Sequence, residues 1–428
     1  MIKWEDVKIA KKVNLSRYTK AAPQSVKDIQ ESQTKLKGLN VLHVNATAQG
    51  GGVAELLHSQ VAFERSAGIN SRWLAMRAPK KFFAITKKIH NLLQGSRGRL
   101  TQEEKKYYLR VNKILAEKIL AFLPDDCERT LLVVHDPQPL ALYEYLPGGC
   151  WSILRLHIDL REPNSKVLDF LLPYMNNFPR IIISNANYEQ SLVEVKTPLE
   201  VIEPAIDPLA DKNKAMSRVQ AGSILRKFGL DINKSLVTQV SRFDEFKDPM
   251  GVVKAFKKVK SKNRDAQLVL AGFAFAKDDP EAWEVYKKTK RLADDVDDVC
   301  LFIDPEALRK NKVSNDEFIN ALYTASDIVV QNSKREGFGL TITEAMWKAK
   351  PVIAGNAEGA RLQISNNKNG LIVDSNNELA GAMDKLLNNK KLRADLGRAA
   401  RESVKKQYLM PRYIYKHLRV YIKLMKSK

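Results

Sequence analysis

The stretch NVLHVNATAQGGGVAELLHSQVAFERSA, from Asn40 to Ala67, is typical of the first repeat of a parallel α/β sheet. Its short apolar run from Asn40 to Asn45 predicts a buried strand, and apolar periodicity predicts a helix from about Val53 to Ala67. Three glycines, residues 50–52, join the two. Glycine tolerates positive φ and lets the backbone approach a ligand closely. The triplet matches neither the P-loop nor the full dinucleotide fingerprint, so a plain tight turn stays open as the alternative.

The same alternation of strand and helix runs along most of the chain and restarts after Pro204. Further strands are expected at 72–76, 131–135, 152–157, 180–184, 236–240, 267–271, 299–303, 327–331, 351–354 and 371–373. The segment PAIDPLADKN, Pro204 to Asn213, carries two prolines among polar residues and is interpreted as the hinge. We predict an α/β protein of two doubly wound, Rossmann-like domains, residues 1–212 and 213–408, that face each other across a cleft.

The last residues, 409–428, predict a closing helix that packs back on the N-terminal domain. Tyr413, His417, Val420 and Leu424 recur at helical spacing, which is typical of a packed face. Basic residues lie between them, so a helix lying on a membrane surface is the alternative.

Composition narrows the class of protein. The chain has 428 residues, 44% of them hydrophobic, and no run approaches the roughly 18 apolar residues of a membrane span. The N-terminus lacks the apolar region of a secretory signal. Cys127, Cys150 and Cys300 have no metal-like spacing and the six histidines are dispersed, so we expect a reduced, cytoplasmic setting and no metal.

A net charge of +22 is compatible with an anion-binding surface or with an ordinary lysine-rich one. No nucleic-acid-binding motif accompanies it, so we expect neither a nucleic-acid partner nor a membrane, and we leave a homodimer open.

A second informative stretch is SKREGFGLTITEAMWKAKPVIA, from Ser333 to Ala354. A helix that begins near Leu340 places Glu336 on a loop and Glu344 within its first turns. Carboxylates accept hydrogen bonds from sugar hydroxyls, and a helix N-terminus binds phosphate, so this arrangement suits a nucleotide sugar. Alternatively, both glutamates are solvated acids that favour the helix dipole.

Two cations follow the predicted strand 236–240, in SRFDEFKDP. Arg242 offers a planar fork and Lys247 a point charge, and at the carboxyl end of a strand they could neutralise a diphosphate leaving group. A pair of surface cations is the alternative.

Histidines end two apolar runs, in HDPQP (His135, Asp136) and RLHIDL (Arg155, His157, Asp159). A histidine at a strand end can bind a sugar hydroxyl or move a proton. Either ring could instead be a satisfied, half-buried histidine.

Taken together, these elements resemble the retaining GT-B glycosyltransferases of family 4, and most closely the glycosyltransferring trehalose synthases. The matching segments are HVNATAQGGGVAELLHS (43–59), HNLLQG (90–95), VVHDPQP (133–139), RLHIDLREPN (155–164), AIDPLADKN (205–213), TQVSRFDEFKDP (238–249) and REGFGLTITEAMWKAKPVIA (335–354). The last is shared widely in family 4, whereas HDPQP and HIDL are more specific to the trehalose-forming group.

The resemblance implies a retaining hexosyltransferase that moves glucose from a nucleoside-diphosphate glucose to free glucose, giving α,α-trehalose without a cofactor or metal. It assigns donor binding to Gly51, Gly52, Arg242, Lys247, Glu336, Phe338, Gly339, Leu340 and Glu344. It assigns acceptor binding to His135, Asp136, Arg155, His157 and Asp159, and catalysis to His157, Glu336, Arg242 and Lys247. Glu344 would bind the ribose and Glu336 the donor sugar.

The chain departs from the family pattern at two positions. Asp248 follows the phosphate-binding lysine where glycine is usual, and Glu358-Gly359 stands where a Gly-Gly pair is usual. An acid beside a diphosphate is unfavourable unless it points away. These departures bear on donor affinity or on the preferred nucleotide base. A family 4 enzyme with another sugar, sugar-phosphate or lipid-linked acceptor is kept as the alternative, and the basic C-terminal tail is the feature that favours it. A non-catalytic nucleotide-sugar-binding protein and a phosphorylase of the same fold are further alternatives.

Overall fold

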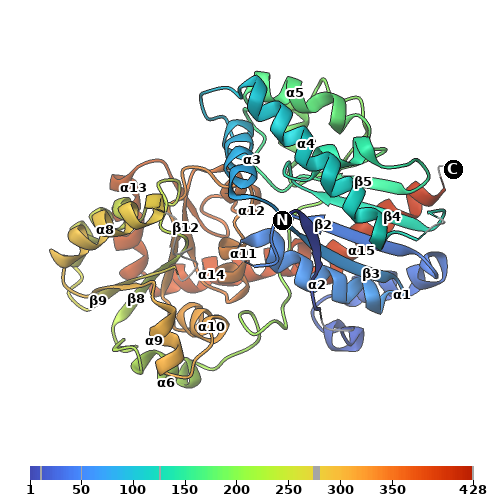
Figure 1. The fold of residues 1–428 in the computed structure, drawn as a ribbon. Coiled ribbons are helices and arrows are strands. Elements are labelled where there is room, and N and C mark those ends of the chain that lie inside the picture. The colour runs from blue at the N-terminus through green and yellow to red at the C-terminus, as the bar shows by residue number, and fades with distance from the viewer. Residues whose placement is uncertain (10–11, 50, 125–126, 273–279, 427–428) are drawn as a thin grey trace. The chain divides into compact units, whose positions relative to one another are not determined.

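Two parallel sheets, each with helices on both faces, organise the chain (Figure 1). The structure is a computed structural model that describes residues 1–9, 12–49, 51–124, 127–272 and 280–426. One compact unit comprises Met1–Pro204 with Met410–Lys428, and the other comprises Ala205–Leu409. The units thus divide after Pro204 and Leu409, where the sequence analysis expected boundaries after residues 212 and 408.

The first unit has seven strands in the order β1-β3-β2-β4-β5-β6-β7. They are β1 (Lys3–Asp6), β2 (Asn40–Asn45), β3 (Asn70–Arg77), β4 (Thr130–His135), β5 (Trp151–Arg155), β6 (Ile181–Ile183) and β7 (Leu199–Val201). Every pairing is parallel except that of β1 with β3.

Six helices cover this sheet: α1 (Pro23–Leu36), α2 (Gly52–Ser66), α3 (Lys80–Leu93), α4 (Gln102–Ile119), α5 (Ser165–Met175) and α15 (Met410–Met425). Short 3-10 segments lie at Leu15–Tyr18, Leu120–Phe122, Leu140–Tyr145 and Ala186–Ser191. The main apolar core lies where α3, α4 and α5 pack on one face of the sheet. Helices α1, α2 and α15 contact one another on the other face.

The second unit has six parallel strands in the order β10-β9-β8-β11-β12-β13. They are β8 (Ser235–Val240), β9 (Ala266–Ala271), β10 (Val299–Phe302), β11 (Ile328–Gln331), β12 (Val352–Gly355) and β13 (Leu371–Val373). The helices are α6 (Arg218–Arg226), α7 (Pro249–Lys260), α8 (Pro280–Asp294), α9 (Pro305–Lys310), α10 (Asn315–Ala325), α11 (Leu340–Trp347), α12 (Glu358–Gln363), α13 (Asn376–Leu387) and α14 (Lys390–Gln407).

Each sheet has a switch point at which the strand order reverses. In the first unit it lies between β2 and β4, and in the second between β8 and β11. Ligands of doubly wound sheets bind outside the carboxyl ends of the strands at such a point. The segments after β2, β4, β8 and β11 carry most of the sequence-derived candidates, so the topology gathers them at these edges.

The sequence analysis predicted all of the strands except β1 and β7. Only Trp4 of β1 is buried, and β7 has no fully buried residue, so neither strand has the apolar run on which a strand prediction depends. The predicted doubly wound α/β class is confirmed.

The C-terminal helix α15 packs on α1 and α2 of the first unit. Its Tyr413, His417, Val420 and Leu424 are all buried. Its basic side chains also bind the unit, since Lys423 pairs with Glu200 at 2.7 Å. The closing-helix prediction is therefore confirmed. None of the helices in the described part of the chain is long and apolar enough to cross a membrane.

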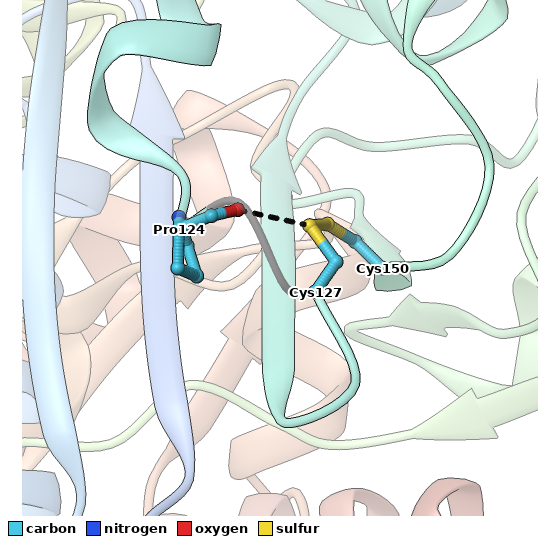
Figure 2. Close-up of a disulfide and its surroundings, with 3 residues drawn as sticks. All are labelled: Pro124, Cys127 and Cys150. Atoms are coloured by element: carbon cyan, nitrogen blue, oxygen red, sulfur yellow. Dashed lines mark hydrogen bonds between the residues drawn. A yellow bond between two sulfur atoms is a disulfide. The ribbon is translucent and has the colours of Figure 1, made fainter.

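Cys127 and Cys150 form a disulfide that the sequence analysis did not predict (Figure 2). The two cysteines are 23 positions apart, but Cys127 precedes β4 and Cys150 directly precedes β5. Because β4 and β5 are neighbouring strands, the Cα atoms of Cys127 and Cys150 lie 4.6 Å apart. Cys300 lies in β10 of the other unit and is free.

Candidate functional site

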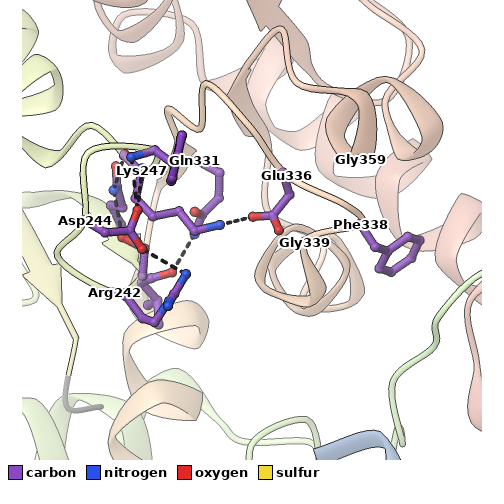
Figure 3. A network of polar contacts seen from close by, with 12 residues as sticks. Arg242, Asp244, Lys247, Gln331, Glu336, Phe338, Gly339 and Gly359 are labelled. Atoms are coloured by element: carbon purple, nitrogen blue, oxygen red, sulfur yellow. Dashed lines mark hydrogen bonds and ion pairs between the residues drawn. The ribbon is translucent and has the colours of Figure 1, made fainter. Parts of the chain in front are cut away.

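The loop after β8 holds the two predicted phosphate-binding cations (Figure 3). The Arg242 side chain is 65% exposed, and its Nη2 atom lies 2.9 Å from Asp244. Lys247 is only 14% exposed and forms an ion pair with Glu336. One cation is therefore open to a ligand, while the other already neutralises a carboxylate that follows β11.

Asp248 occupies the position where glycine is usual in the family. Its backbone conformation explains why either glycine or aspartate fits there. Its φ of 46° and ψ of 52° lie in the left-handed region, which glycine adopts readily and aspartate tolerates. Its carboxylate caps helix α7 by accepting from the Gly251 N–H at 3.2 Å and also accepts from Asn332 at 3.1 Å. The charge is therefore engaged with α7 and the end of β11.

Glu336 lies on the loop that leads into α11, as predicted. Gly339 caps that helix with φ of 84°, and the helix begins at Leu340, where the sequence analysis placed it. A Cβ atom on Gly359 would lie 2.5 Å from the Phe338 carbonyl oxygen, so only glycine lets α12 pack this closely on the loop. The Gly359 N–H also donates to the Glu336 carbonyl oxygen at 2.9 Å. Backbone contacts thus fix the loop that presents Glu336.

Glu344 is fully buried on α11, so the alternative of a solvated helix-start acid is wrong for this residue. Its carboxylate lies 2.6 Å from Lys212 Nζ and 3.4 Å from the Tyr323 hydroxyl. It borders a cavity of about 170 Å³ at the carboxyl ends of β8 and β9. The lining residues are Lys212, Val240, Ser241, Arg242, Ala271, Gly272, Asn315, Ile319, Thr341 and Glu344. The structure thus brings Arg242 and Glu344 to one cavity at the switch point.

In the first unit, the glycine loop ends at the N-terminus of α2. Gly51 caps the helix with φ of 83°, and a Cβ there would meet no atom within 4 Å. Its backbone conformation, rather than crowding, therefore favours glycine. Gly52 is exposed at the first position of α2. Gly50 lies outside the described residues.

The candidate histidines lie side by side across β2, β4 and β5. His135 Nδ1 lies 2.9 Å from His157 Nε2, and their rings stack at 5.2 Å. On its other side, His135 Nε2 lies 3.0 Å from His43 Nδ1. His135 is fully buried, and its ring contacts two other rings, as that of a satisfied histidine would. Its role as an acceptor-binding residue stays a prediction.

The row of rings ends on Glu64, which the sequence analysis missed together with His43. Glu64 is fully buried on α2 and accepts from His43 Nε2 at 2.8 Å, Ser71 at 2.6 Å, Gln60 at 2.9 Å and Tyr421 at 2.8 Å. Burial by itself would raise the pKa of Glu64, but the His43 charge and these hydrogen bonds lower the pKa to about 2. The sequence signal that could have identified Glu64 is a glutamate on the apolar face of a predicted helix.

Arg155 is also fully buried, and its role as an acceptor-binding residue stays a prediction. It donates from Nη2 to the Ile202 carbonyl oxygen at 2.7 Å. Asp136 nearby accepts from the His157 N–H at 2.7 Å and has φ of 62°. Burial raises the pKa of Asp136 to about 7, although this hydrogen bond and the Arg155 charge oppose the rise. Asp136 therefore holds the His157 backbone in position.

His157 and Asp159 follow β5 at the edge of the sheet. His157 is partly exposed, unlike the other two rings. Asp159 is buried, and its carboxylate pairs with Arg161 at 3.1 Å. Of the predicted acceptor residues, His157 is the one that is not fully buried.

Metal-ligating groups and a second cavity also bear on the site. Within the described residues, no group of three or more His, Cys, Asp or Glu side chains is arranged to hold a metal ion. A second cavity, of about 300 Å³, lies among Asn40, Asn70 and Thr130, at the amino ends of β2, β3 and β4. It is thus at the opposite edge from the histidines.

Family models match both units. Residues 43–190 match the model described as "Trehalose synthase, N-terminal domain", and residues 222–403 match "Glycosyl transferases group 1". The trehalose synthase of Rubrobacter xylanophilus is 39% identical over 401 residues, which are 93% of this chain and 94% of that protein. That of Pyrococcus horikoshii is 38% identical over 405 residues, or 94% of each.

More distant similarities carry less information. A trehalose phosphorylase of Pleurotus pulmonarius is 25% identical over 412 residues, 86% of this chain but 55% of that protein. An E. coli structure described as trehalose-6-phosphate bound with UDP-2-fluoro glucose superposes with a TM-score of 0.72 at 14% identity, over 91% of this chain and 99% of the other. A sucrose-phosphate synthase from Thermosynechococcus elongatus gives 0.71 at 16% identity, over 91% and 100%. These structures support the GT-B fold alone.

Proposed function

Because the chain belongs to the trehalose synthase family of glycosyltransferases, we propose that it transfers glucose from a nucleoside-diphosphate glucose to free glucose and forms α,α-trehalose. The observation that carries the proposal is the similarity to trehalose synthases along nearly the full length of both proteins. The cavity that joins Arg242 to Glu344 supports a nucleotide-sugar donor in the second unit.

The donor would bind at the switch point of the second sheet. Glu344 borders the cavity, and a carboxylate suits a ribose, whose hydroxyls donate hydrogen bonds. Arg242, exposed at the same cavity, suits the diphosphate, and Lys247 holds Glu336 close to where the sugar would lie. Cleavage of the bond to the leaving diphosphate develops negative charge on its oxygens, which these cations stabilise.

Transfer would retain the anomeric configuration. We propose an oxocarbenium-like transition state for this transfer. In that step the bond from the anomeric carbon to the diphosphate breaks while the glucose hydroxyl attacks from the same face. The hydroxyl proton passes to the leaving phosphate oxygen. The protein's contribution is then positioning and electrostatic stabilisation.

The direct test is to incubate the protein with ADP-, UDP- or GDP-glucose plus glucose and to analyse the products. We expect release of nucleoside diphosphate and a non-reducing disaccharide with at least one donor. Glucose 6-phosphate replaces glucose in a parallel reaction and tests the sugar-phosphate acceptor. Trehalose with inorganic phosphate tests the phosphorylase alternative. A reducing product, or no product with any donor, contradicts the proposal.

We also propose that the reaction needs no divalent metal, because Arg242 and Lys247 carry the positive charge that a metal would otherwise supply. EDTA should then leave the rate within about twofold of its value without chelator. A loss of activity that magnesium or manganese restores would contradict this point and leave the choice of substrates standing.

A further inference from the structure

The buried row of histidines in the first unit has a directional hydrogen-bond pattern. His43, His135 and His157 join through single nitrogen–nitrogen contacts of 3.0 and 2.9 Å. Each contact needs one N–H and one lone pair, so the rings cannot choose their tautomers independently. If one ring reverses its tautomer, its neighbours must reverse theirs.

Glu64 lies at the inner end of the row and fixes the direction in which its hydrogen bonds run. The Glu64 carboxylate already accepts from the Ser71 hydroxyl, the Gln60 amide N–H and the Tyr421 hydroxyl, so it is an acceptor toward the ring as well. His43 must therefore donate from Nε2. In the neutral row, His43 then accepts at Nδ1 from His135 Nε2–H, and His135 accepts at Nδ1 from His157 Nε2–H. His157 is left with a lone pair on Nδ1.

That Nδ1 atom is the outer end of the row. It is buried and has no hydrogen-bond partner among the described residues, although the His157 ring is partly exposed. A buried nitrogen without a partner is costly, which points to a ligand hydroxyl or a water as its natural partner. The sequence-derived assignment of His157 to the sugar-binding region agrees with this.

The charges around the row set where a proton can rest. Burial, followed by the neighbouring charged groups, lowers the pKa of His135 and of His157 well below the ordinary value. The titratable and charged groups that face the rings from the surrounding elements are Glu64, Asp136, Arg155, Tyr413, His417 and Tyr421. Among these, Glu64 is the carboxylate in direct contact with a ring, and that ring is His43.

We propose that Glu64, His43 and His135 are positioning residues that set whether the Nδ1 atom of His157 accepts or donates a hydrogen bond, so that the row acts as a proton relay behind the sugar site. This rests on the proposed function only for the identity of the sugar ligand. The relay itself stands on the geometry of the four side chains.

The proton balance is simple. A proton taken up at His157 Nδ1 releases the Nε2 proton of that ring to His135 Nδ1. His135 then releases its Nε2 proton to His43 Nδ1, and His43 becomes an imidazolium paired with the Glu64 carboxylate. One proton enters, none leaves, and His157 and His135 both stay neutral but change tautomer. Nδ1 of His157 now donates where it previously accepted.

Nitrogen-15 NMR of the protein labelled at its six histidines tests the relay directly, since two-bond proton couplings identify each tautomer. At high pH we expect the Nε2–H tautomer at His43, His135 and His157. On acidification, His135 and His157 should switch together to Nδ1–H while His43 becomes doubly protonated. A His157 ring that keeps one tautomer, or that becomes an imidazolium by itself, overturns the proposal.

Glu64→Gln removes the charge that holds the proton, and it should move the switch to lower pH by at least one unit. His135→Phe should uncouple His43 from His157, and His58→Gln is the control, because His58 is an exposed histidine on the same helix as Glu64. An unchanged switch in Glu64→Gln contradicts the relay. If either variant fails to fold, the titration of the unmodified protein still decides.

Kinetics give an independent reading. With nucleoside-diphosphate glucose and glucose, Glu64→Gln should shift the acid limb of the kcat/KM profile in the same direction as the NMR transition. A merely structural role would lower kcat/KM by one factor at every pH and thereby contradict the relay. If no sugar is transferred at all, the proposed function fails, while the NMR titration still tests the relay.

Discussion

Two arginines that follow parallel strands show how differently the two units hold their functional groups. Arg155 ends β5 in the first unit and has no exposed surface, whereas Arg242 follows β8 in the second unit and is 65% exposed. Burial lowers the pKa of Arg155, and its guanidinium donates to a backbone carbonyl. Arg242 borders a cavity instead. The first unit thus supports its site from within, while the second presents charge to a ligand.

The largest effect is expected where charge meets the leaving group. Lys247→Ala should lower kcat about 10²- to 10³-fold, in the range seen when one transition-state donor is removed. The folded fraction should remain close to that of the parent, because Lys247 lies on a loop rather than in a core.

Lys334→Ala is the matched control, since this lysine lies on the segment after β11 and pairs with Asp248 at 3.6 Å with its side chain 64% exposed. Thermal melting and donor titration should be recorded with the rates. A Lys247→Ala protein that melts early but is fully active when folded would assign Lys247 a structural role.

Two glutamates of the second unit, Glu344 and Glu336, differ in burial, so their substitution should have different effects. Glu344→Gln removes a fully buried charge that pairs with the partly buried Lys212, so it should lower the free energy of unfolding by about 3 kcal/mol and raise the donor KM. Glu336→Gln acts on a partly exposed loop residue, and it should mainly lower kcat, by about 10- to 100-fold. Equal stability losses with unchanged kinetics in both variants would show that neither carboxylate contacts the donor.

In the first unit, Asp136 should make stability depend on pH. Its folded pKa of about 7 lies above its unfolded value of about 3.9, so the folded state holds the proton longer. The free energy of unfolding should therefore fall as pH rises from about 4 to 7, by about 1–4 kcal/mol in total. Asp136→Asn should remove this slope, because asparagine keeps the acceptor oxygen and tolerates positive φ.

Chemical denaturation of both proteins at several pH values measures the difference. Asp169→Asn serves as the control, since it removes an exposed carboxylate from α5 in the same unit. If the parent and Asp136→Asn stay parallel from pH 4 to pH 8, Asp136 does not carry the proton.

The smallest effect is expected at Asp248. Asp248→Gly removes the cap of α7, which costs about 1 kcal/mol, but relieves the left-handed backbone by a similar amount. The melting temperature should stay within about 4 °C, and removal of a carboxylate near Lys247 should lower the donor KM modestly. A large rise in donor KM would mean that Asp248 itself helps to bind the donor.

The sequence predicted the strands other than β1 and β7, the switch-point loops and the start of α11, because these depend on local patterns of apolar residues and glycine. It could not predict which polar residues are buried. His43 and Glu64 join His135 only because β2 and β4 pair and α2 packs over them. The contact of Cys127 with Cys150 likewise depends on the pairing of β4 with β5. Arg155 is likewise buried because of tertiary packing. In the sequence, both Arg155 and Arg242 stand at the end of a strand, so position alone does not tell the buried arginine from the exposed one.

The central claim, transfer of glucose to the anomeric hydroxyl of glucose, is tested most directly by a labelling experiment. The protein is given glucose labelled with carbon-13 at C1 as acceptor and unlabelled nucleoside-diphosphate glucose as donor, and the product is examined by NMR. We predict a non-reducing disaccharide with label at one anomeric carbon and the α configuration at both. Label in a free reducing end, or a β linkage, would contradict it.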